Sequence, residues 1–65
     1  MDLVIFVLGG ETILLRDVTK FKFYIDDYIL YYKIVGSDIT RKKENVSLIR
    51  TADENEIRKD WQEQP

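Results

Sequence analysis

The side chains that carry most enzyme chemistry are largely missing from this sequence of 65 residues. It contains no Cys and no His. Their absence removes thiolate nucleophiles, disulfides, thiolate zinc sites and the commonest general base. Two serines, Ser37 and Ser47, have no His or Lys partner in a recognisable nucleophile motif. We therefore expect no catalytic residues, no cofactor and no metal, and the sequence predicts a protein that is not an enzyme.

Two short motifs resemble parts of ligand sites but are more typical of turns. The pair Asp26-Asp27 offers two carboxylates, yet neighbouring residues of a strand point to opposite faces, and the spacing of a calcium loop is absent. The pair Gly9-Gly10 is too short for a phosphate loop, which needs a longer glycine pattern that opens a helix. Both pairs indicate hairpin turns.

Lysines and tyrosines alternate with apolar residues around Asp26-Asp27, and this pattern has some functional content. Such side chains on one open sheet face bind single-stranded nucleic acid through base stacking and phosphate neutralisation. The same pattern is typical of a solvated face whose lysine stems cover tyrosine rings. A protein contact through Ile29 and Val35 on this face is a further reading. The candidate nucleic-acid-binding residues are Lys22, Tyr24, Tyr31, Lys33 and Lys42.

Hairpins are the elements that must position these residues. The run Leu3–Leu8 is apolar on both faces, which predicts a strand covered on both sides. A two-residue turn at Gly9-Gly10 would place Phe6 opposite Ile13, and Val4 opposite Leu15. These four side chains would then share one face.

The central hairpin is the best-defined element, because two strands alternate independently and agree. Pairing residues 20–25 with 28–35 across Asp26-Asp27 places Phe23 opposite Leu30, and Phe21 opposite Tyr32. The expected apolar face is made of Phe21, Phe23, Ile25, Tyr28, Leu30, Tyr32 and Ile34.

Shorter strands follow this hairpin. A type II′ turn at Gly36-Ser37 leads into a strand over residues 38–41, with Ile39 on the apolar face. Residues 42–45 form a polar tip, and a last strand over 46–49 turns Val46 and Leu48 inward. We therefore expect a mainly β fold over residues 1–51: an antiparallel meander of about six short strands, forming a curled sheet or a partly closed barrel.

The acidic segment 52–65 predicts one short C-terminal helix or tail. Thr51 and Glu54 fit a capping box. Ile57 and Trp61 lie four residues apart and share one side of such a helix. Because two apolar residues make a narrow stripe, we expect the helix to order only when it docks, which makes Ile57 and Trp61 candidate partner-binding residues.

Length and charge favour a partner. A chain of about 60 residues buries only about 60% of its unfolded surface, and without disulfides or metal its spare stability is small. Residues 1–51 hold eight basic and seven acidic residues, which does not favour general nucleic-acid binding. The leading prediction is a cytoplasmic, non-enzymatic protein–protein interaction or assembly module that forms a homodimer. The alternatives are the nucleic-acid-binding β module and a small regulator or inhibitor docking on a larger protein.

Overall fold

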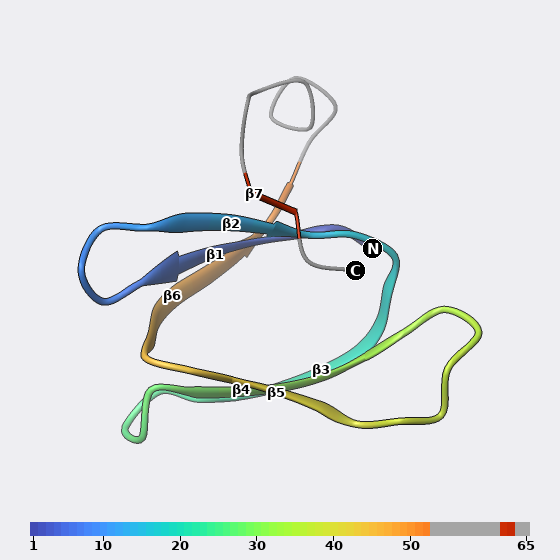
Figure 1. Ribbon diagram of the computed structural model, residues 1–65. Helices are drawn as coiled ribbons and strands as arrows, with labels where there is room; N and C mark the ends of the chain where they lie inside the picture. Colours follow the sequence, from blue (N-terminus) through green and yellow to red (C-terminus); the bar gives the residue numbers. More distant parts are fainter. Residues whose placement is uncertain (53–61, 64–65) are drawn as a thin grey trace.

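A computed structural model describes residues 1–52 and, for the backbone alone, residues 62–63. In these residues all regular structure is β, and the strands form two sheets that lie one above the other (Figure 1). The predicted mainly β, antiparallel class is confirmed. No helix in the part of the chain that the structure describes is long and apolar enough to cross a membrane.

Sheet A has the strand order β6-β1-β2-β7, and sheet B has the order β3-β4-β5. Strands are antiparallel except for the short parallel pair of β2 and β7. Sheet A contains β1 (Leu3–Val7), β2 (Thr12–Leu15), β6 (Val46–Thr51) and β7 (Gln62–Glu63). Sheet B contains β3 (Val18–Tyr24), β4 (Ile29–Ile34) and β5 (Arg41–Glu44).

The chain crosses between the sheets twice, after β2 and after β5, so the expected single curled sheet or partly closed barrel is replaced by two layers. Asp17 and Asn45 make the corners with positive φ angles of 59° and 62°. Backbone hydrogen bonds fasten both corners: Val35 N donates to Asp17 O at 2.8 Å, and Leu8 N donates to Asn45 O at 2.8 Å. The described strands close into no barrel.

The hydrophobic core lies between the two sheets. Leu3 and Ile5 of β1 point into it, while Val4 between them points to the other side of sheet A. All three are buried, so the predicted cover on both faces of the first strand is confirmed. The core cluster consists of Leu3, Ile5, Ile13, Leu15, Val18, Leu30, Tyr32 and Val46. Val18 opens β3 and is fully buried.

The first hairpin differs from its predicted register by one residue. Phe6 lies opposite Thr12, and Ile5 lies opposite Ile13. The reason is the turn: Val7 N donates to Glu11 O at 2.9 Å, which leaves three residues in the loop. Because side chains alternate along a strand, this shift of one residue moves Phe6 and Val4 to the face opposite Ile13 and Leu15. The prediction that these four side chains share one face of the sheet is therefore wrong.

Strands β5 and β6 also differ from expectation. β5 is formed by Arg41–Glu44, so it takes in most of the expected polar tip 42–45 and only the last residue of the strand expected over 38–41, while Ile39 lies in the preceding loop with 71% of its surface exposed. In β6 a β-bulge breaks the alternation opposite Phe6 and Val7. Val46 therefore points inward as expected, but Leu48 points outward and is 53% exposed.

Most of the expected C-terminal helix lies outside the described residues, as do Ile57 and Trp61. At the described positions there is no helix. Ala52 N continues the sheet by donating to Asp2 O at 2.9 Å, and Gln62–Glu63 pair with β2 as a strand.

Candidate functional site: the outer face of sheet B

The candidate site lies on the β3–β4 hairpin, and the predicted register of this hairpin is confirmed. Phe23 lies opposite Leu30, and Phe21 lies opposite Tyr32. Leu30 and Tyr32 are buried against sheet A, as this register requires. The inner face is shorter than expected, however. Ile25 and Tyr28 belong to the turn, where they are 60% and 46% exposed, and Phe21 is 41% exposed near the edge.

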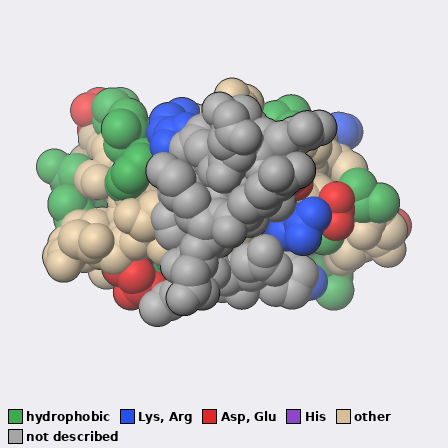
Figure 2. Space-filling view, turned by 90° about the horizontal axis from the view of Figure 1, so that it is seen from above, with side chains coloured by type: hydrophobic (Ala, Val, Ile, Leu, Met, Phe, Trp, Pro, Cys, Tyr) green, Lys and Arg blue, Asp and Glu red, His purple; other side chains and the backbone are tan. Residues whose placement is uncertain are grey.

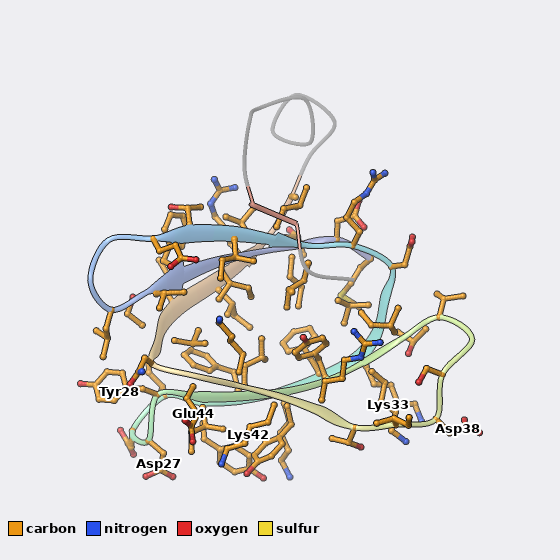
Figure 3. The ribbon with its side chains drawn as sticks, viewed as in Figure 1. Asp27, Tyr28, Lys33, Asp38, Lys42 and Glu44 are labelled. Carbon is orange, nitrogen blue, oxygen red and sulfur yellow. The ribbon has the colours of Figure 1, made fainter. Side chains whose placement is uncertain are left out.

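The opposite face of this hairpin gathers the predicted lysines and tyrosines into three cross-strand rows. The middle row joins Lys22, Tyr31 and Lys42 of three neighbouring strands. A second row joins Tyr24, Ile29 and Glu44, and a third pairs Lys20 with Lys33. Figure 3 labels Lys33, Lys42 and Glu44 on the side of sheet B away from sheet A. We call this surface the lysine–tyrosine face: Lys20, Lys22, Tyr24, Tyr31, Lys33 and Lys42.

Lys20 is the one member of the lysine–tyrosine face that was absent from the residues predicted from sequence. The alternation Lys20-x-Lys22-x-Tyr24 carries the signal that finds it. Conversely, Val35 does not join this face. It lies in the turn after β4, 62% exposed, beside the bond from Ser37 N to Ile34 O.

Aromatic contacts order the middle of the lysine–tyrosine face. The rings of Tyr24 and Tyr31 meet edge to face, with centroids 5.8 Å apart and an interplanar angle of 88°. Lys22 Nζ lies 5.5 Å from the centroid of the Tyr24 ring, within the range of a cation–π contact. Tyr24 nevertheless keeps 41% of its surface exposed, so π surface remains accessible to a ligand.

The lysines of this face differ in their partners. Lys42 Nζ forms an ion pair with Glu44 Oε1 at 3.1 Å. The hydrogen bond to this carboxylate, and then its negative charge, raise the pKa of Lys42 above its ordinary value. Among the described residues the ammonium groups of Lys20 and Lys33 make no ion pair. Two cations are thus available to an anionic ligand at one end of the face.

Two hollows lie on either side of Tyr31. The first is bordered by Phe21, Tyr31, Tyr32 and Thr40 as well as by Lys20, Lys22 and Lys33, and it is open to solvent. The second is bordered by Tyr24, Asp27, Ile29 and Tyr31. We call the first, which three lysines border, the basic hollow; the second combines aromatic and aliphatic side chains with a carboxylate.

Exposed apolar side chains gather at one end of the molecule, in the hairpin turn next to the row of Tyr24 and Ile29 and in the turn after β1. Leu8, Ile25 and Tyr28 are 49%, 60% and 46% exposed. The hairpin turns that carry them meet at the second corner, where Leu8 N donates to Asn45 O and Val46 N donates to Tyr28 O. We call these three residues the apolar end. By contrast, hydrophobic, basic and acidic side chains are mixed among the described residues that are visible in Figure 2.

The described residues contain no group of three or more carboxylate, His or Cys side chains that could hold a metal ion. Comparisons with protein families, with curated proteins and with solved structures find no match to this sequence.

Proposed function

We propose that this protein is a non-enzymatic binding module whose ligand is a single-stranded nucleic acid held across the lysine–tyrosine face. One observation carries the proposal: the sheet register assembles Tyr24 and Tyr31 with four lysines on one open face. Exposed aromatic rings stack on bases of any sequence, and neighbouring lysines neutralise the phosphates. This combination is a common means of holding a single strand on a sheet.

The near-neutral charge of the whole chain does not oppose this function, because the charges are sorted on the surface. Lys20, Lys22 and Lys33 border the basic hollow, whereas Asp27 borders the second hollow and Glu44 lies in the row of Tyr24 and Ile29. With four lysines contacting phosphates, the logarithm of the binding constant should fall with the logarithm of salt concentration with a slope of about −3. Such modest electrostatics suit a weak, salt-sensitive binder.

Fluorescence anisotropy with a labelled oligonucleotide of about 10 nucleotides tests the proposal. Tyr31→Ala should weaken binding by at least about fivefold, because it removes a stacking surface. Tyr28→Ala is the matched control, since Tyr28 is an exposed tyrosine in the turn outside the face. Absence of binding at low salt, or equal losses in both variants, would refute the proposal.

Self-association is a second candidate function, supported by the apolar end. Three large apolar side chains at one end offer a patch that a second copy covers symmetrically. Sedimentation at micromolar concentration should then give a dimer, and Ile25→Glu should return it to a monomer. Ile39→Glu is the control, because Ile39 is 71% exposed in the loop at the other end. A wild-type monomer across this range excludes the dimer.

Docking of the chain on a larger protein through Ile57 and Trp61 stays a prediction from sequence.

A further inference from the structure

The second hollow of the lysine–tyrosine face differs chemically from the first. Tyr24, Ile29 and Tyr31 give it aromatic and aliphatic walls, and Asp27 is the single charged side chain among the described residues that border it. The hairpin turn fixes the position of Asp27, because Asp27 N donates to Tyr24 O at 3.2 Å. A hollow bordered by two aromatic rings, one aliphatic side chain and one carboxylate suits a flat ring that carries a hydrogen-bond donor.

We infer that this hollow takes a nucleobase with an exocyclic amino group, and that the protein therefore prefers cytosine to thymine or uracil. The inference rests on the proposed function. A carboxylate accepts a hydrogen bond from the N4 amino group of cytosine. Thymine and uracil present a carbonyl oxygen at the equivalent position, which faces the carboxylate as a second acceptor and is repelled. Cytosine and uracil are otherwise matched in size, thymine adds only a C5 methyl group, and all three offer a similar ring for stacking.

The basic hollow completes this arrangement on the other side of Tyr31. Lys20, Lys22 and Lys33 border it, so phosphates of the strand are attracted to this hollow. The bases then point across Tyr31 toward Tyr24 and Asp27. A carboxylate on a face that binds a polyanion is unfavourable unless it meets a donor. Asp27 borders the hollow that Tyr24 shares and not the one that the three lysines border, which is the arrangement that base recognition requires.

The experiment compares oligo(dC) with oligo(dT), each of about 10 nucleotides, on the wild-type protein and two variants by fluorescence anisotropy. The wild type should bind oligo(dC) about five- to tenfold more tightly, the low end of a specific base contact because the hollow is open. Asp27→Asn should lose this preference and still bind oligo(dT), since an amide both donates and accepts hydrogen bonds. Asp26→Asn removes the same charge from the neighbouring residue and should keep it.

The other outcomes distinguish failure of base selection from failure of the proposed function. Binding of both oligonucleotides without preference, or a preference that Asp27→Asn leaves intact, overturns base selection while the proposed function stands. An equal loss of preference in Asp26→Asn overturns it too, because the effect would then belong to the charge of the turn. Failure of the wild type to bind either oligonucleotide overturns the proposed function itself.

Discussion

At the scale of single residues, Tyr31 links the separate features of the lysine–tyrosine face. It lies between Lys22 and Lys42 in the middle row, meets the ring of Tyr24 edge to face, and borders both hollows. The sequence predicted its pairing with Lys22, because the alternation of two strands leaves one register that buries the apolar side chains of both. Its ring contact with Tyr24 depends on rotamers, which alternation does not specify.

The ion pair of Lys42 gives a prediction at this scale. Glu44→Gln should lower the pKa of Lys42 toward its ordinary value of 10.5, because both the charge-assisted hydrogen bond and the negative charge are lost. A titration of the Lys42 side chain followed by NMR measures this change. Glu11→Gln is the control, since Glu11 lies in the β1–β2 turn. An unchanged pKa in Glu44→Gln would show that the two side chains do not pair in solution.

The effect on stability has a defined sign. A lysine whose pKa is raised in the folded state contributes stability at pH values below its unfolded pKa. That contribution is lost as the pH rises through the folded value. For Lys42 the contribution is therefore complete at neutral pH and disappears only above about pH 10.5. Both side chains are well exposed, so the pair contributes little.

At the scale of elements, the register of a hairpin could be predicted where both of its strands alternate between apolar and polar residues. It could not be predicted where the register depended only on the number of residues in the loop. The central hairpin has two alternating strands, and its register is as expected. The first hairpin depended on loop length alone, and Gly9 and Gly10, with φ angles of 103° and 97°, belong to a loop one residue longer than assumed. The bulge in β6 leaves no mark in the hydrophobic pattern.

The edge strand β5 was missed for a different reason. Its residues Arg41–Glu44 are all charged, a composition that favours loops and turns. Charged side chains are also the usual means of protecting an exposed sheet edge from pairing with another chain. Lys43, opposite Leu30, is half-buried on the inner side of this edge. Sequence rules for strands rest on apolar alternation, which a protected edge does not display.

The bulge in β6 predicts unequal effects of two truncations. Val46→Ala should destabilise the protein by about 2 kcal/mol, because Val46 is fully buried in the core. Leu48→Ala removes a larger side chain but should change stability by less than about 0.5 kcal/mol, since Leu48 points to solvent. Urea unfolding of both variants measures the difference. Similar losses in the two would indicate the regular alternation that the sequence suggested.

At the scale of the whole molecule, two sheets share one core and are fastened at both corners by backbone hydrogen bonds. Side chains from β1 and β2 interlock with those from β3 and β4, so neither sheet buries its apolar face alone. Strands that are distant in sequence therefore contribute to one hydrophobic core. We expect the described β region to unfold as one cooperative unit.

Strand order predicts the pattern of hydrogen exchange within that unit. β1 and β4 are each paired on both sides, so their amides should exchange slowest. β5 pairs on one side only and is exposed at three of its four residues, so it should exchange fastest among the strands of sheet B. Amide exchange followed by NMR provides the measurement. Equal protection of β4 and β5 would contradict the order of sheet B.

Because the chain returns from sheet B to sheet A, we expect the fold to hold together after proteolytic cleavage. β6 lies beside β1, although the two are separated by most of the described sequence. A single cleavage in the exposed loop between β4 and β5 would leave a piece held by both layers: β5 by β4, and β6 by β1. The severed fragments should therefore co-elute as one folded particle and separate only in denaturant.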